Sequence, residues 1–155
     1  MAQKKKIERL SSLLKDHALL ALDTSIFIYH FKADPKYIAL TRRIFSSIEK
    51  GKNQAVSTVI SLSEILVKPL EEENFNAAED YKIMLERFPN FALVPIDSKM
   101  AFSSAALRAK YKIKTPDALQ IAGAIQKSAT LFITNDKQLK KIEEIKVILL
   151  NDLME

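Results

Sequence analysis

The chain has 155 residues, 48% of them hydrophobic, which suits a single domain with a substantial buried core. It contains no cysteine, which excludes disulfide frameworks, thiolate metal sites and cysteine nucleophiles and agrees with a reducing cytoplasm. The net charge of +5 favours a polyanionic partner such as nucleic acid, although a basic composition alone is a weak argument.

Two further features exclude other classes of protein. Gly51 and Gly123 are the only glycines, so the chain has no Gly-rich phosphate loop and no dinucleotide fingerprint. No apolar run approaches the roughly 20 residues that a bilayer-spanning helix needs, and Lys15 and Asp16 interrupt the first apolar stretch. We therefore expect a soluble, cytoplasmic protein without a membrane partner.

Short apolar runs alternate with segments of helical spacing along the chain. The predicted strands are Ala18–Leu22, Gln54–Val59, Phe91–Ile96, Thr130–Thr134 and Lys146–Leu150. The predicted helices are Ser25–Phe31, Tyr37–Lys50, Ser61–Leu70, Phe75–Phe88, Ser98–Tyr111, Pro116–Lys127 and Lys137–Ile142. This alternation predicts an α/β fold, with a central parallel sheet of about five strands flanked by helices, in one domain over residues 1–155.

Acidic residues follow the ends of the first four predicted strands, in the order Asp23, Glu64, Asp97 and Asp136. A further acid, Asp117, stands at a helix start for which Thr115 is the predicted N-cap and Pro116 lies in the first turn. The carboxyl ends of parallel strands meet at one edge of a sheet, which is the usual place for a ligand site in such folds. We therefore expect these side chains to lie close together.

Each acid also has an ordinary structural explanation. The aspartates after the strands could cap helices, Asp117 could gain from a helix dipole, and Ser61 with Glu64 forms a capping-box pattern. Caps do not explain why several carboxylates should share one edge, where like charges repel. A divalent cation removes this conflict, and oxygen-only ligands suit Mg²⁺ or Mn²⁺. The two histidines, His17 and His30, are interpreted as surface or packing residues rather than ligands.

Four segments together resemble the motifs of the PIN-domain family of ribonucleases, which includes the VapC-type toxins of toxin–antitoxin pairs. In chain order they are Leu22-Asp23-Thr24-Ser25-Ile26-Phe27-Ile28, Val56-Ser57-Thr58-Val59-Ile60-Ser61-Leu62-Ser63-Glu64-Ile65, Thr115-Pro116-Asp117-Ala118-Leu119-Gln120-Ile121-Ala122 and Leu131-Phe132-Ile133-Thr134-Asn135-Asp136. The resemblance covers roughly residues 18–150. It implies a three-layer PIN-like fold and leaves residues 1–17 as an N-terminal extension.

The resemblance also implies a function. Its catalytic and metal-binding residues would be Asp23, Glu64, Asp117 and Asp136, with the Thr134 hydroxyl orienting a carboxylate or ligand. The expected activity is hydrolysis of RNA phosphodiester bonds with Mg²⁺ or Mn²⁺, and the protein would be the toxin of a toxin–antitoxin pair if a cognate antitoxin exists. Asp97 lies outside the family's motifs and is interpreted as a helix cap.

Three segments carry hypotheses about partners. Lys110, Lys112 and Lys114, in an extended stretch, would point to one side and contact RNA phosphates beside Asp117; the alternative is a solvated loop. The helix Ser25–Phe31 is apolar on more than one face, so it is covered by the chain's own core, by a second copy in a homodimer or by an antitoxin helix. The extension would be a dimer arm, a packing helix or an RNA contact.

Two rival functions remain open from the sequence. A catalytically inactive RNA-binding PIN scaffold is one, and the four intact acids count against it. A phospho-receiver-like signalling domain of flavodoxin-like build is the other. Receivers usually pair two acids after the first strand, whereas Asp23 is followed by Thr24.

Overall fold

The computed structural model describes residues 1–155 and contains one parallel sheet of five strands. The strands are β1 (Leu19–Leu22), β2 (Gln54–Thr58), β3 (Phe91–Val94), β4 (Leu131–Thr134) and β5 (Lys146–Leu149). Their order in the sheet is β3-β2-β1-β4-β5, and every neighbouring pair is parallel. The predicted parallel sheet is therefore confirmed, and each predicted strand is recovered to within two residues at either end.

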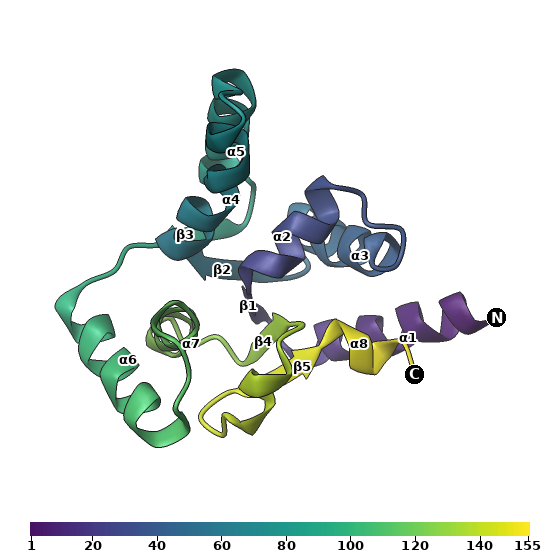
Figure 1. Cartoon of the computed structure of the whole chain (residues 1–155). Helices are drawn as coiled ribbons and strands as arrows, with labels where there is room; N and C mark the ends of the chain where they lie inside the picture. Colours follow the sequence, from purple (N-terminus) through teal and green to yellow (C-terminus); the bar gives the residue numbers. More distant parts are fainter.

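Helices cover both faces of the sheet, as the three-layer prediction requires (Figure 1). The helices are α1 (Ala2–Asp16), α2 (Thr24–Phe31), α3 (Ile38–Glu49), α4 (Val59–Glu71), α5 (Phe75–Arg87), α6 (Ser98–Tyr111), α7 (Thr115–Gln126) and the short α8 (Leu150–Leu153). Helices α2 and α3 lie on one side of the strands and α6 and α7 on the other. The predicted helix Lys137–Ile142 is a single 3₁₀ segment, η1 (Lys137–Lys141).

Alternate side chains of each strand enter two separate cores. Leu20 and Leu22 of β1 belong to a cluster of 18 buried residues that includes side chains of α1, α2 and α3, whereas Ala21 faces a cluster of 15 that includes α6 and α7. In β4, Ile133 and Phe132 divide in the same way. A sheet buried on both faces reads as a continuous apolar run, which explains why these strands were predictable.

The N-terminal segment packs onto the body of the domain. Leu10 and Leu14 of α1 are buried in the first core. The guanidinium of Arg9 donates to the backbone carbonyls of Asp152, at 3.0 Å, and Glu155, at 2.8 Å. Of the alternatives for residues 1–17, the structure thus supports a packing helix.

Helix α2 is covered largely by the chain itself. Ile26 and Phe27 are buried, and the Phe27 ring lies 5.4 Å from that of Phe45 and 5.5 Å from that of Phe91. Ile28 and Phe31 are half-buried and line a groove that is described below. None of the helices is both long enough and apolar enough to span a lipid bilayer.

Gly123 allows α7 to approach β2 unusually closely. A Cβ atom at this position would lie only 2.5 Å from the Cγ2 atom of Thr58, which is closer than two carbon atoms can pack. The absence of that atom lets the preceding turn of α7 reach the carboxyl end of β2. Gln120 therefore lies within hydrogen-bonding distance of Thr58.

Candidate active site

The four acids predicted for the site all lie at the carboxyl edge of the sheet. Asp23 directly follows β1, Asp136 lies two residues beyond β4, Glu64 is in α4 after β2, and Asp117 is in the first turn of α7. Strands β1 and β4 are neighbours in the sheet. From β1 the chain continues to β2 and β3 on one side, and from β4 it continues to β5 on the other. Such a switch point opens a crevice at the carboxyl edge, where α/β proteins place ligands. We call Asp23, Glu64, Asp117 and Asp136 the four-acid site.

Asp23 is held from two directions. It is 9% exposed and N-caps α2, with its Oδ1 accepting from the Thr24 N–H at 2.8 Å. Its Oδ2 accepts from the fully buried hydroxyl of Thr134 at 2.6 Å. Thr134 Oγ1 in turn accepts from the backbone N–H of Asp136 at 3.1 Å, so one hydroxyl ties the end of β4 to both aspartates.

Burial and mutual repulsion act on the carboxylates. Burial raises the pKa of Asp23, opposed by the hydrogen bonds from Thr134 and Thr24 and assisted by the charges of Glu64 and Asp136. Burial, and then the charges of the other three acids, raise the pKa of Asp117 to about 6, and Lys114 opposes this shift. No ion pair in the structure includes a member of the four-acid site. The site is an electrostatically unbalanced group of acids.

Glu64 and Asp136 are less enclosed. Glu64 is exposed, and its Oε1 accepts from the Thr24 hydroxyl at 2.8 Å. Asp136 is half-buried and N-caps η1, with Oδ1 accepting from the Gln138 N–H at 2.9 Å. The capping explanation is therefore correct for Asp23 and Asp136, but it leaves their shared location and their repulsion unexplained.

The chemistry of these residues fits a divalent cation, although their present side-chain positions do not form a complete coordination shell. No three acidic or histidine side chains in the structure are arranged so that they could hold one ion as they stand. The donors at this edge are carboxylate oxygens, which Mg²⁺ and Mn²⁺ prefer, and no lysine or arginine neutralises them by an ion pair. Binding would require side-chain rotation, which the exposed Glu64 and the half-buried Asp117 and Asp136 can undergo.

The loop that carries Asp136 is fastened to the C-terminal segment by a ring of polar contacts. Asn135 Oδ1 accepts from the Asn151 N–H at 3.0 Å, and Asn135 Nδ2 donates to the Tyr29 hydroxyl at 3.2 Å. The Tyr29 ring stacks on that of Tyr37 with centroids 4.3 Å apart, and the Tyr37 hydroxyl donates to Asn151 Oδ1 at 2.7 Å. The residue next to Asp136 is thus fixed by groups that are distant in sequence.

Other sequence-based assignments have mixed outcomes. Asp97 is a cap as predicted, with Oδ1 accepting from the Met100 N–H at 2.8 Å. The histidines make contacts away from the acids, His17 with Thr130 and His30 with Thr41.

Two predicted caps are wrong. Lys114 is the N-cap residue of α7 and makes no side-chain cap, so Thr115 already belongs to the helix. The N-cap of α4 is Thr58, whose hydroxyl accepts from the Ile60 N–H at 3.2 Å, so Ser61 with Glu64 is not a capping box. Helix α4 starts two residues earlier than predicted because the Thr58 hydroxyl can cap it directly at the end of β2.

The extended geometry predicted for the basic stretch is also wrong. Lys110 lies in the last turn of α6, and its Nζ is 3.2 Å from Glu144 Oε1 and 5.0 Å from the ring centroid of Tyr111. Lys112 ends that helix in the left-handed region, with φ of 60°. The three lysines therefore do not form one extended row, because α6 continues to Tyr111 and the chain turns sharply after it. Lys114 remains close enough to act on the charge of Asp117.

Sequence reasoning missed the polar side chains beneath the acids, Thr24, Ser57, Ser61 and Gln120, all of them buried. Gln120 stands among Ala118, Ile121 and Ala122, which face the core. A long polar side chain within the apolar face of a helix was the available signal, because buried amides need hydrogen-bond partners.

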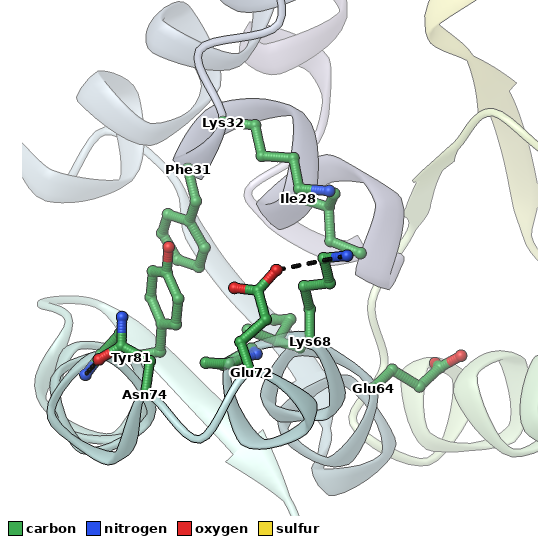
Figure 2. A pocket seen from close by; sticks show the side chains of 11 residues that line it. Ile28, Phe31, Lys32, Glu64, Lys68, Glu72, Asn74 and Tyr81 are labelled. Carbon is green, nitrogen blue, oxygen red and sulfur yellow. Dashed lines mark hydrogen bonds and ion pairs between the residues drawn. The ribbon is translucent and has the colours of Figure 1, made fainter.

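An open groove lies beside the four-acid site, between α2, α4 and α5. It has a volume of about 320 Å³, and its lining includes Ile28, Phe31, Lys68, Pro69 and Tyr81. The rings of Phe31 and Tyr81 stack with centroids 5.0 Å apart. Figure 2 shows Glu64 at one end of the groove, with its carboxylate directed away from this aromatic pair.

Comparison with known proteins agrees with this geometry. The sequence profile of the PIN domain matches residues 20–145. Solved structures of similar fold include a toxin–antitoxin complex from Klebsiella pneumoniae, 22% identical with a TM-score of 0.64, covering 84% of this chain and 97% of that one. VapBC2 from Rickettsia felis, bound to a promoter DNA fragment, is 19% identical with a TM-score of 0.67, covering 84% and 98%.

VapBC-1 from nontypeable Haemophilus influenzae is 19% identical, with a TM-score of 0.65 and coverage of 86% and 98%. At these identities the likeness concerns the fold. No curated protein matches the chain.

Proposed function

Since this chain belongs to the PIN domain family, we propose that it is a Mg²⁺- or Mn²⁺-dependent endoribonuclease that hydrolyses RNA phosphodiester bonds. The observation that carries the proposal is the four-acid site itself. Four carboxylates lie at the switch point of the sheet without a neutralising ion pair, and the pKa of Asp117 is raised to about 6. Carboxylates that repel one another in the isolated protein are stabilised when a divalent cation binds among them.

Each acid has a place in this proposal. Asp23, Glu64, Asp117 and Asp136 would hold the metal, and Thr134 keeps Asp23 in place through its hydrogen bond. A bound divalent ion would supply an activated water and stabilise negative charge on the phosphate. Asp117 or Asp136 would accept a proton from the attacking water. No side-chain nucleophile is required.

We assign RNA binding to the basic residues next to α7. Lys112 and Lys114 are exposed and precede Asp117, so they are suited to contact phosphates entering the site. Lys110 would join them only on release from Glu144, with which it forms an exposed ion pair. Because exposed ion pairs contribute little to stability, this pair is a weak obstacle to RNA.

The wider role that we propose is that of a cytoplasmic toxin with an antitoxin partner. Its support is the shared fold with the toxin–antitoxin complexes described above. The groove between α2, α4 and α5 and the exposed apolar side chains of Val67, Phe75 and Met84 offer surfaces for an antitoxin or for a second copy of the chain. A homodimer and an antitoxin complex are both compatible with these surfaces.

The strand order argues against the receiver-like alternative. Flavodoxin-like domains have the order 2-1-3-4-5, whereas this sheet has the order 3-2-1-4-5. The inactive RNA-binding scaffold is a rival within the same family, and it predicts binding of RNA without cleavage.

Cleavage assays separate these functions. With Mn²⁺ or Mg²⁺ the purified protein should cut single-stranded RNA internally, and excess EDTA should abolish the cutting. Mn²⁺ should also raise the melting temperature by an amount that grows with its concentration, because it binds the folded state. Cleavage that persists in EDTA would refute the metal mechanism, and RNA binding without cleavage at any metal concentration would favour the scaffold.

A further inference from the structure

A buried hydrogen-bond network lies directly beneath the four-acid site, with Gln120 at its centre. Gln120 is 3% exposed and lies in α7 one turn after Asp117. Its Oε1 accepts from the backbone N–H of Thr58 at 3.2 Å and from the Thr58 hydroxyl at 2.8 Å. One amide group thus joins α7 to the start of α4.

The same amide also reaches the helix after β1. Gln120 Nε2 donates to the hydroxyls of Thr24, at 3.1 Å, and Ser61, at 2.7 Å. The orientation of the amide is determined by the Thr58 N–H, which can only donate and therefore must face the oxygen. The NH₂ group consequently faces Thr24 and Ser61.

This orientation determines where each hydroxyl proton goes. Thr24 Oγ1 accepts from Gln120 and also lies 3.0 Å from the Ser61 hydroxyl. The Thr24 proton is directed to Glu64 Oε1 at 2.8 Å, because that carboxylate oxygen can only accept. Ser61 likewise accepts from Gln120 and donates to Ser57 at 2.7 Å. Ser57 passes its proton to the Leu22 carbonyl at 2.8 Å, a shorter contact than its 3.4 Å to Gln120. Each buried hydroxyl therefore has one donor role.

We propose that Gln120 is a positioning residue for the metal site: it fixes Thr24 as a donor to Glu64 and so holds that exposed carboxylate toward the other acids. The second oxygen of Glu64 accepts no hydrogen bond within the protein. Gln120 itself touches no carboxylate of the site and acts through Thr24. The inference rests on the proposed function, because the group being positioned is a proposed metal ligand.

The variant Gln120→Glu tests the direction of the network. It preserves the shape of the side chain but replaces the only NH₂ donor with an acceptor. The Thr24 proton would then turn toward the introduced carboxylate and away from Glu64. Loss of an outer-sphere partner of this kind weakens metal binding on the order of 10–100-fold.

Asn53→Asp is the matched control. Asn53 is also 3% exposed, and its Nδ2 donates to the carbonyls of Leu14, at 2.8 Å, and His17, at 2.6 Å, at the amino end of β2. This variant makes the same amide-to-carboxylate change in a buried network remote from the acids. It should lower the melting temperature but leave the affinity for Mn²⁺ unchanged.

The experiment is a calorimetric titration of Mn²⁺ into the full-length proteins, paired with melts in EDTA. We expect Gln120→Glu to bind Mn²⁺ roughly 10–100-fold more weakly than the natural protein, and Asn53→Asp to bind like the natural protein. If Gln120→Glu and the natural protein bind Mn²⁺ with equal affinity, the positioning role of Gln120 is refuted, but the proposed metal site is not. A natural protein that binds no Mn²⁺ would refute the proposed metal site as well.

A second pair of variants serves if Gln120→Glu does not fold. Thr24→Val removes the hydroxyl with little change in volume, whereas Thr24→Ser keeps it. Thr24→Val should weaken Mn²⁺ binding and Thr24→Ser should restore most of it, because only the serine can relay a donor to Glu64. Equal Mn²⁺ affinities in the two variants would refute the relay from Gln120.

Discussion

Asp23 and Asp97 occupy the same local position in different parts of the sheet. Each follows a parallel strand, β1 or β3, and each N-caps the next helix by accepting from a backbone N–H. Asp97 is exposed, and the hydrogen bonds from Met100 and Gln126 lower its pKa. Asp23 is buried near the other three acids of the four-acid site, and its pKa is raised. The same strand–aspartate–helix pattern therefore gives a stabilising cap at one place and an unbalanced charge at the other.

Strand order explains the difference. β1 is the central strand and lies beside β4 at the switch point, whereas β3 is an edge strand. An aspartate after the central strand meets acids from neighbouring strands and from α7, while an aspartate after the edge strand meets solvent. A capping residue becomes a candidate ligand through its position in the sheet.

The largest expected contrast between the two aspartates is in catalysis. Asp23→Asn should lower RNA cleavage on the order of 100-fold or more, because it removes charge from the proposed metal site. Asp97→Asn should stay within a few-fold of the natural enzyme. Cleavage rates under saturating Mn²⁺ measure both, and an Asp97→Asn enzyme as inactive as Asp23→Asn would contradict the distinction.

A second contrast concerns the pH dependence of stability in EDTA. The pKa of Asp117 in the folded protein is raised to about 6 from its ordinary 3.8, and that of Asp23 is also raised. The contribution of Asp117 to stability is therefore complete below about pH 4 and is lost as pH rises through about 6, and the raised pKa of Asp23 acts in the same direction. Asp97 has a lowered pKa, so its contribution is present above about pH 4 and is lost at lower pH.

Denaturant unfolding from pH 3 to pH 8 separates these contributions. Asp117→Asn should lessen the loss of stability between pH 4 and pH 7, and Asp97→Asn should lessen the loss below pH 4. If Asp117→Asn follows the pH profile of the natural protein, repulsion within the four-acid site is not what destabilises the metal-free fold.

The smallest expected effect is that of the ordinary cap. Asp97→Ala removes the acceptor for the Met100 N–H and should lower the melting temperature by roughly 2–4 °C. Mn²⁺ should stabilise this variant as much as the natural protein. Asp97→Ser, which retains a capping oxygen, is the matched control and should recover most of the loss; a Mn²⁺ response that disappears in Asp97→Ala would place Asp97 in the metal site.

The sequence predicts the sheet and most helices well because their determinants are local. Leu20 to Leu22 and Leu131 to Ile133 form uninterrupted apolar runs, which is the pattern of strands buried on both faces. Asp23 and Asp136 could be placed at one edge because the ends of parallel strands share a direction. These predictions needed the connectivity of the elements and no detailed packing.

The remaining features depend on packing between distant segments. Thr58, which caps α4, contacts the amide of Gln120 because Gly123 lets α7 lie close against β2. No local sequence pattern encodes this approach. Lys110 and Tyr111 contact Glu144, which is more than thirty residues away. The expected extended row of lysines does not form because Lys110 belongs to α6, whose end at Tyr111 the sequence predicts, and because the chain turns at Lys112 into the left-handed region.

The polar ring around Asn135 has a consequence for the order in which the protein forms during translation. The side-chain oxygen of Asn135 accepts from the backbone N–H of Asn151. The loop beside Asp136 therefore cannot reach its final position until residue 151 has left the ribosome. Strand β5, which pairs with β4, also emerges after it. A nascent chain that already carries Asp23, Glu64 and Asp117 thus lacks a fixed fourth acid. In the proposed nuclease, the four-acid site is therefore completed only after β5 and Asn151 have emerged and packed against β4 and Asn135.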